Sequence, residues 1–210
     1  MWSLREAGYV KALLFDYGQR HRIELQHAQK ICQFFHVDYA VADLTAVNHL
    51  IRKGSQAGDD LPPDGHYSDE TMKTTIVPNR NSIMLSIAVG HAVTLGIHDV
   101  YFAAHSGDHA IYPDCRDKFV EKFADAMYLA NEWDPVFVWA PFVHMLKEDI
   151  VKFGNNLGVP FQMTWSCYKG GQKHCGKCGT CTERREAFQL ANIDDPTEYE
   201  YTGPLLEAQS

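Results

Sequence analysis

The chain has 210 residues, 45% of them hydrophobic, and a formal net charge of −8 at pH 7. A globule of this size buries enough surface to fold without a dense set of disulfides, and its hydrophobic content excludes wholesale disorder. The negative charge disfavours direct binding to nucleic acid, because that binding depends mainly on neutralising phosphates.

The apolar segments of the sequence also indicate where in the cell we expect the protein to act. The first residues lack a basic stretch followed by an apolar one, so we expect no secretory signal. The longest apolar helical pattern, about residues 83–95, is shorter than the roughly 20 residues that a membrane span needs. We therefore expect a cytoplasmic protein with no membrane partner and no direct nucleic-acid partner. The sequence leaves the oligomeric state open, and a homodimer is one arrangement that it allows.

The first half of the chain alternates between strand-like and helix-like segments. Residues 10–15 form a short apolar run that ends in Asp-Tyr-Gly, as expected of a buried strand followed by a turn. Apolar residues close to helical spacing occupy 23–35, and residues 37–42 return to strand-like composition. Residues 52–75 are rich in Gly, Pro, Asp, Ser and Thr, which predicts a long functional loop or lid.

The second half continues the alternation. Residues 81–95 are apolar nearly all round, which predicts a central buried helix. Strands are predicted at 99–104 and 136–139, and helices from the apolar stripes at 119–127 and 150–157. Alternating strands and helices are typical of an α/β fold with a mainly parallel sheet.

Four of the six cysteines crowd into a short stretch with the spacing Cys-x7-Cys-x2-Cys-x2-Cys. Four thiolates at such spacing can close a tetrahedral metal site, and the glycines between them allow a tight backbone. We expect a structural zinc held by Cys167, Cys175, Cys178 and Cys181. A four-cysteine iron–sulfur cluster is the main alternative, His174 could replace one thiolate, and buried or disulfide-paired cysteines are a further possibility.

Polar residues also follow the first predicted strand, in the run Asp-Tyr-Gly-Gln-Arg-His at 16–21. Side chains at the carboxyl end of a parallel strand are well placed to meet a ligand. The alternative is that Arg20 and His21 only form the solvated first turn of the next helix.

Arg80 stands at the start of the apolar helix predicted for residues 81–95. A cation in that position is costly unless it meets an anion, which makes Arg80 a candidate for anion binding. The neighbouring Asn79 has a simpler interpretation as a helix cap.

Two further polar runs, residues 105–109 and 112–116, follow the strand predicted at 99–104. We interpret Asp108 as a candidate for hydrogen bonding to a nucleobase-like ring, and Asp114 as a helix cap. The two histidines at 105 and 109 could suggest a metal pair, but the glycine between them and the absence of a carboxylate base disfavour it.

Taken together, these blocks resemble the 7-cyano-7-deazaguanine synthases of the queuosine pathway. The matching segments occur in the family's order and cover nearly the whole chain: FDYGQRH at 15–21, VPNRN at 77–81, YPDCR at 112–116, and SCY with HCGKCGTC between 166 and 181. Any one of them could arise by chance, whereas four in order make the resemblance specific.

The resemblance implies an adenine-nucleotide alpha-hydrolase-like fold, a Rossmann-like parallel sheet with helices on both faces, followed by a C-terminal zinc-binding segment. It implies a ligase that uses ATP and Mg²⁺ to convert 7-carboxy-7-deazaguanine and ammonia into 7-cyano-7-deazaguanine. Arg20, Arg80 and Arg116 become candidates for catalytic contacts with phosphate or carboxylate groups. The implied substrate-binding residues are Tyr17, Arg20, Arg80, Asn81, Asp108 and Asp114.

We expect a single domain over residues 1–210, with a nucleotide-binding core at 1–163, a zinc-binding segment and helix at 164–192, and an acidic tail at 193–210. The family begins with a strand and a Ser-Gly-Gly-x-Asp-Ser loop that grips pyrophosphate, and this sequence contains neither. Because the chain opens in helix-like residues 1–8, we expect an N-terminal truncation that weakens ATP binding.

Three alternatives to the complete ligase remain open from the sequence. One is a non-catalytic homologue that binds deazaguanine but turns over no ATP. Another is a variant that stops at the amide. A zinc-held interaction module is the weakest alternative, because it leaves the strand-end runs without a role.

Overall fold

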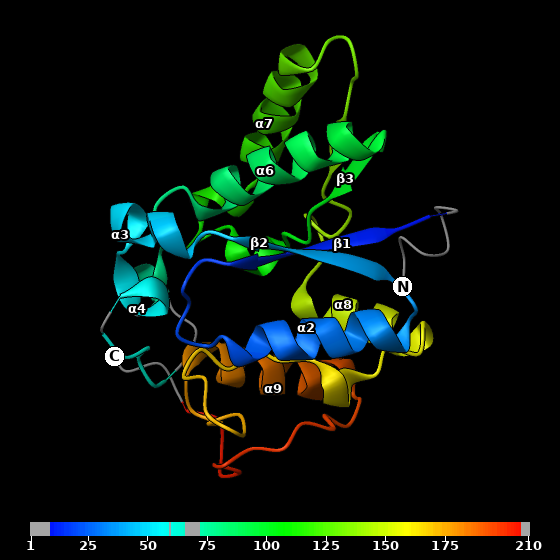
Figure 1. Cartoon of the computed structure of the whole chain (residues 1–210). Coiled ribbons are helices and arrows are strands. Elements are labelled where there is room, and N and C mark those ends of the chain that lie inside the picture. The colour runs from blue at the N-terminus through cyan, green and yellow to red at the C-terminus, as the bar shows by residue number, and fades with distance from the viewer. Residues whose placement is uncertain (1–8, 59, 66–71, 207–210) are drawn as a thin grey trace. The chain divides into compact units, whose positions relative to one another are not determined.

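The computed structural model describes residues 9–58, 60–65 and 72–206 of the chain (Figure 1). The chain divides into two compact units, residues 1–78 with 148–210 and residues 79–147. The expected helix-like opening falls on residues 1–8, which lie outside the described residues.

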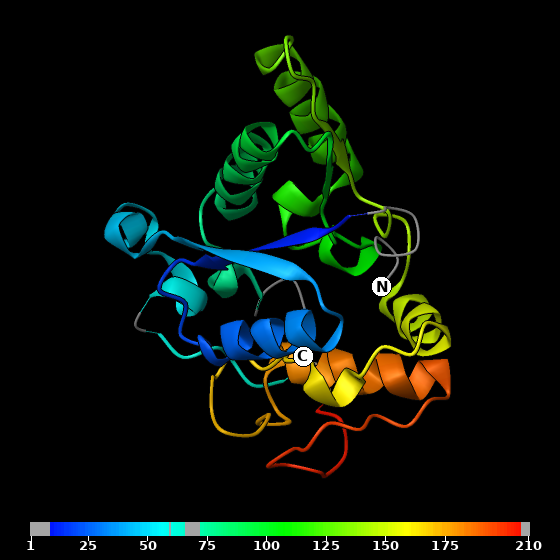
Figure 2. The same cartoon turned by 45° about the vertical axis from the view of Figure 1, so that its right-hand side comes forward.

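The first unit begins with a parallel two-stranded sheet. Strands β1 (Lys11–Asp16) and β2 (Asp38–Asp43) pair in register along their full lengths, and Figure 2 shows them side by side. Parallel strands need a crossover connection, and α2 (Ile23–Phe34) supplies it. The two strands and the helix predicted from hydrophobic periodicity are confirmed.

Short helical turns follow β2. They are η1 (Thr45–Val47), α3 (Asn48–Ile51), α4 (Gly54–Ala57) and η2 (Lys73–Thr75). The predicted loop at 52–75 is thus interrupted by short helical turns, and its residues 59 and 66–71 lie outside the described residues. Its polar composition concealed buried side chains: Ser55, Gln56 and Thr75 are almost fully buried, and the Thr75 hydroxyl donates to the carbonyl oxygen of Met72 at 2.6 Å.

The C-terminal part of the first unit consists of α8 (Lys147–Asn156), η5 (Phe161–Met163) and α9 (Gly179–Ala191). Val151 of α8 packs with Ala187, Phe188 and Ala191 of α9 in one hydrophobic cluster. Figures 1 and 2 both show α9 running alongside α2. Burial of these apolar faces positions the N-terminal end of α9, where two of the four clustered cysteines lie.

The second unit repeats the parallel strand–helix–strand arrangement. Its elements are α6 (Arg80–Leu95), β3 (Asp99–Tyr101), η3 (Ser106–Asp108), η4 (Pro113–Cys115), α7 (Asp117–Ala130) and β4 (Phe137–Trp139). Strands β3 and β4 pair in parallel. Among the described residues the parallel pairing is thus confirmed, but it forms two two-stranded sheets.

The core of the second unit corrects two predictions. Its buried cluster contains Leu85, Val89 and Ala92 of α6 with two valines of the β4 region. These three follow one helical stripe, whereas Ser86 and other small residues of α6 are exposed, so the prediction of a helix buried all round is wrong. The strand predicted at 99–104 ends at residue 101, because the chain turns there towards η3.

Membrane crossing was excluded from the sequence on the length of its apolar segments. Within the described ranges, none of the helices has both the length and the apolar character that a membrane span requires.

Candidate functional site

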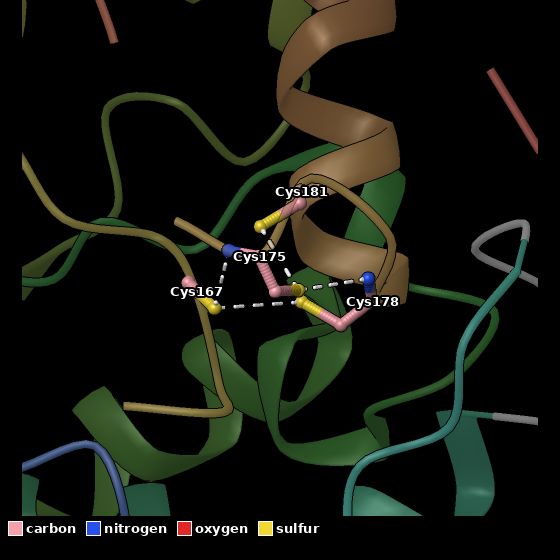
Figure 3. Close-up of side chains that lie close together, drawn as sticks. All are labelled: Cys167, Cys175, Cys178 and Cys181. Atoms are coloured by element: carbon pink, nitrogen blue, oxygen red, sulfur yellow. Dashed lines mark hydrogen bonds between the residues drawn. The ribbon is translucent and has the colours of Figure 1, made fainter. Parts of the chain in front are cut away.

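The four clustered cysteines meet in space with their sulfur atoms turned towards one another (Figure 3). All four sulfurs lie within 4.8 Å of one another. The Cys175–Cys181 sulfur distance is 3.9 Å, and the Cys167–Cys178 distance is 4.0 Å. With metal–sulfur bonds of about 2.3 Å, a tetrahedral zinc site requires sulfur separations of roughly 3.8 Å. The cluster therefore fits a tetrahedral metal ion, and the disulfide alternative is wrong because all four cysteines are free.

The backbone around Cys175 explains how the short spacing closes. Gly176 adopts φ +74°, a backbone conformation that residues other than glycine rarely adopt. This turn directs the N–H groups of Lys177 and Cys178 at the Cys175 sulfur, at 3.4 and 3.3 Å. Such N–H donors favour the thiolate form that a metal requires.

Helix α9 supplies the other half of the site. Cys178 is its N-cap residue and Cys181 lies in its first turn. The partial positive charge at a helix N-terminus stabilises thiolates. Hydrogen bonding with Cys167 and the other thiols lowers the pKa of Cys178, whereas the same crowded contacts raise the pKa of Cys181. The cluster thus offers four sulfur ligands, and the helix N-terminus favours the thiolate form that binds a cation.

His174 does not replace one of the four thiolates, because the ligand cluster consists of the four cysteines. Its Nε2 accepts a hydrogen bond from the backbone N–H of Ser166 at 3.0 Å. Its ring lies 4.1 Å from the Trp165 ring and contacts the edge of Tyr199. Burial lowers the pKa of His174 to about 4, which keeps the imidazole neutral. In the part of the chain that the structure describes, the four cysteines are the only cluster of three or more potential metal ligands.

A buried arginine, which the sequence analysis missed, ties the segment before the cysteines to the segment after α9. Arg184 donates to the Thr164 hydroxyl at 2.7 Å and to the carbonyl oxygen of Phe161 at 3.1 Å. It also pairs with Asp195 at 3.4 Å, and Asp195 accepts the Tyr199 hydroxyl at 2.5 Å. The one clue in the sequence is the position of Arg184 on the helix face that becomes buried, and it does not indicate which distant residues Arg184 contacts.

Residues 195–203, here called the C-terminal strap, pack against the cysteine loop. The backbone of His174 pairs with that of Tyr199, and Glu200 N–H donates to the His174 carbonyl oxygen at 2.8 Å. Arg185 of α9 donates to the carbonyl oxygen of Gly203 at 2.5 Å. These contacts give an ordered role to a segment whose composition predicted only an acidic tail.

In the first unit, Tyr17 and Arg20 lie in the turn after β1, as predicted. Tyr17 is buried, and its hydroxyl donates to the Gln56 side-chain oxygen at 3.3 Å. Arg20 donates from its guanidinium to the carbonyl oxygens of Gly58 and Asp60, both at 3.2 Å. The turn is therefore fastened to the segment after α4.

The interpretation of His21 as part of a solvated turn is wrong, because only 2% of it is exposed. Gln19 is also buried: its side-chain oxygen accepts from Tyr17 N–H, and its amide donates to the Phe15 carbonyl oxygen and to Glu24. A run of polar residues at a strand end predicts exposed side chains. The tertiary contacts that bury it come from residues far along the chain.

In the second unit, Asn81 and Asp114 come together. The Asp114 carboxylate accepts the backbone N–H of Asn81 at 3.1 Å, and the Asn81 side chain donates to the Cys115 sulfur at 3.2 Å. Asp114 thus caps a helix as predicted, but the helix is α6 and not the one that follows it. Asn79, predicted as a cap, occupies the N-cap position of α6 without a side-chain capping bond.

The charged residues around this contact are less buried. Arg80 lies with its guanidinium carbon 5.9 Å from the Tyr112 ring centroid. Asp108 lies 3.2 Å from the Nε2 of His105. Arg116 is exposed and donates to the His109 carbonyl oxygen at 2.7 Å. Arg80 and Asp108 both retain partly exposed faces.

The predicted site residues thus form two groups, one in each unit. The first unit contains Tyr17 and Arg20 with the cysteine cluster, and the second contains Arg80, Asn81, Asp108, Asp114 and Arg116. Their roles towards a substrate stay predictions. What the two units define is an α/β protein with a closed cluster of four cysteines, whose geometry fits a metal ion, beside a buried polar turn.

Comparison with known proteins identifies the particular family. The sequence profile of the family described as "Queuosine biosynthesis protein QueC" matches residues 1–192. The 7-cyano-7-deazaguanine synthase of Pseudoalteromonas translucida is 49% identical over 199 residues, covering 94% of this chain and 90% of that protein. The synthase of Archaeoglobus fulgidus is 48% identical over 197 residues, covering 93% of this chain and 82% of that protein. The chain belongs to the QueC family, and the resemblance predicted from its motifs is confirmed.

Proposed function

We propose that this chain is an ATP-dependent ligase that converts 7-carboxy-7-deazaguanine and ammonia into 7-cyano-7-deazaguanine. The observation that carries the proposal is sustained identity, 47–50%, to proteins named 7-cyano-7-deazaguanine synthase, over more than nine-tenths of the chain. The four-cysteine centre and the polar strand-end turn fall within the matched region.

The chemistry explains why such a reaction consumes ATP. A carboxylate is a poor electrophile, so adenylation first attaches a good leaving group and releases pyrophosphate. Ammonia then displaces AMP and gives an amide. A second adenylation of the amide oxygen, followed by loss of AMP and a proton, leaves the nitrile. Cations that neutralise the phosphates, together with Mg²⁺, favour each step.

The residues proposed for these contacts are the charged groups already located. Arg20, Arg80 and Arg116 would neutralise phosphate or carboxylate groups, because guanidinium pairs with both in a fork geometry. Asp108 would accept hydrogen bonds from N–H groups of the base, with Tyr17, Asn81 and Asp114 shaping the substrate contacts. In the absence of these cations, transition-state charge would be less well stabilised.

For the cysteine centre we propose zinc in a structural role. Four sulfurs at tetrahedral separations leave no ligand position open for a substrate or a water molecule. Zinc would hold the N-terminus of α9 to the segment that carries Cys167. Elemental analysis of purified protein should find about one zinc per chain, and one cluster's worth of iron with a visible absorption band would instead favour the iron–sulfur alternative.

The activity test is release of AMP from ATP in the presence of 7-carboxy-7-deazaguanine and ammonium, with product identified by mass spectrometry. We expect AMP release that requires the carboxylate. Replacement of Arg20 or Arg80 by alanine should reduce it, whereas the exposed Lys118→Ala variant serves as a charge-matched control. Base binding without carboxylate-dependent AMP release would contradict the ligase and favour the non-catalytic homologue. Accumulation of the amide alone would identify the variant that stops there.

A further inference from the structure

His21, in the turn after β1, has a buried side chain with an unpartnered polar atom, and it lies in contact with the cysteine segment. Only 2% of the residue is exposed. Its Nδ1 has no hydrogen-bond partner among the described residues, whereas both polar groups of the neighbouring Gln19 have partners. Buried polar atoms in folded proteins are nearly always hydrogen-bonded, so an unpartnered one requires an explanation.

The other ring nitrogen determines what Nδ1 can do. Nε2 lies 3.2 Å from a Glu24 carboxylate oxygen. A carboxylate only accepts hydrogen bonds, so Nε2 must carry the proton in this contact. In the neutral ring, Nδ1 is then an acceptor. A ligand that satisfies it must offer an N–H or O–H donor.

The cysteine segment holds the imidazole in place from the other side. The Tyr168 ring lies 4.9 Å from the His21 ring, centroid to centroid, and Tyr168 directly follows Cys167. Gly170 packs so closely on the turn that a Cβ there would lie 2.9 Å from the Arg20 carbonyl oxygen and 3.0 Å from the His21 Cα. A metal ion bound by the four cysteines would therefore fix the segment that holds the His21 ring.

Its surroundings are also suited to a polar ring. The backbone N–H of Arg20 donates to the Gln56 carbonyl oxygen at 2.9 Å, which brings α4 against the same turn. Ser55 of α4 is 1% exposed, and its hydroxyl too has no partner among the residues that the structure describes. Two unpartnered polar atoms, His21 Nδ1 and Ser55 Oγ, thus lie in the turn and in the helix packed against it.

We propose that His21 is a further substrate-binding residue, whose Nδ1 accepts a hydrogen bond from an N–H group of the deazaguanine base while Tyr168 orients its ring. The inference rests on the proposed function. It assigns to the cysteine segment a role in substrate recognition, because the metal positions Tyr168 and Tyr168 positions His21.

The test compares two substitutions of His21, each of which places an amide group near one of the two ring nitrogens. In His21→Asn the amide lies near the position of Nδ1, whereas in His21→Gln it lies near Nε2 and can still reach Glu24. We expect His21→Gln to weaken binding of 7-carboxy-7-deazaguanine about tenfold, the loss of one buried hydrogen bond, and His21→Asn to weaken it less. Binding is measured by calorimetry without ATP, on protein of equal zinc content and equal urea midpoint.

A purely structural role through Glu24 predicts the opposite order, with His21→Gln binding like the native protein, and that result would overturn the inference. Equal affinities for all three proteins, as when Nδ1 binds only a water molecule, would also overturn it. A parallel titration with ATP distinguishes adenine as the donor, and an effect confined to ATP would contradict the assignment. If the native protein binds no deazaguanine, the proposed function fails and the inference fails with it.

Discussion

Replacement of Arg184 by methionine tests the network that joins the cysteine segment to the C-terminal strap. The substitution keeps most of the aliphatic volume and removes the guanidinium. Its donated hydrogen bonds to the Thr164 hydroxyl and the Phe161 carbonyl oxygen are then lost. The Asp195 carboxylate loses its cation while remaining buried.

The magnitude follows from the burial of both partners. The side chains of Arg184 and Asp195 are 9% and 11% exposed. Removing one member of a buried ion pair destabilises a protein by about 3–5 kcal/mol, mostly because the remaining charge is uncompensated. Asp195 keeps the Tyr199 hydroxyl and the Thr197 N–H as donors. We therefore expect a loss near the lower end, about 3 kcal/mol in the free energy of unfolding.

The assay is urea unfolding of zinc-loaded protein, followed by circular dichroism. Lys173→Met is the matched control, because Lys173 pairs with Glu198 at a largely exposed position. Such exposed pairs contribute about 0–1 kcal/mol. The Arg184→Met/Asp195→Asn double variant should recover part of the loss. A loss below about 1 kcal/mol for Arg184→Met would refute the reasoning, since the buried carboxylate would then need no cation.

Three further substitutions test other parts of the structure. Gly176→Ala should speed zinc loss to a chelator, because its Cβ would clash with the Tyr201 carbonyl oxygen of the strap. Gly96→Ala, at a similar φ but in open space, should leave zinc retention unchanged, and equal rates for the two variants would contradict the contact. Burial lowers the pKa of His105 to about 4 from 6.5, so only the unfolded chain gains this proton between those pH values. Native stability should therefore fall by up to about 3 kcal/mol as pH drops from 6.5 to 4. This pH-dependent loss should shrink in His105→Gln, and urea unfolding at each pH measures it, with Asp108, Lys147 and His109 as the charges facing the ring. Cys178→Ser should abolish stoichiometric zinc binding while Cys32→Ser retains it, as elemental analysis will show; zinc retained by both would disprove the site.

The four-cysteine cluster could be predicted from the sequence because it depends on local spacing. The spacing of Cys167 to Cys181 and the glycine at 176 are sufficient to bring four sulfurs together, wherever the segment lies. The strands β1 and β2 could also be predicted, because each segment has strand-like composition, although β1 is only partly buried and β2 is largely exposed. Local sequence patterns were therefore sufficient to predict the cysteine cluster and the two strands.

Other features depend on residues far apart in the chain. Asp114 caps α6 across 33 residues, and a carboxylate next to one helix gives no sign that it serves another. His21 and Gln19 are polar and follow a strand, yet both are buried, and the ring of Tyr168, far along the chain, packs against His21. The apolar composition of α6 predicted burial on every side, but only one stripe faces the core. Hydrophobic content reports the tendency of a helix to be buried, not the number of its neighbours.

The strap shows the same limit. Residues 195–203 are acidic and lack helical or strand periodicity, so their composition predicts a tail. Their order comes from Arg184 and Arg185, which lie on α9, and from the backbone of His174. Paired charges at large sequence separation leave no pattern in a single sequence.

As a member of the QueC family, this chain is expected to carry out the synthase reaction. The most direct measurement is mass spectrometry of a reaction containing purified zinc-loaded protein, 7-carboxy-7-deazaguanine, ammonium, Mg²⁺ and ATP. We expect 7-cyano-7-deazaguanine together with AMP, and nitrogen-15 from labelled ammonium in the nitrile. Unchanged carboxylate, with zinc bound and the protein folded, would contradict it.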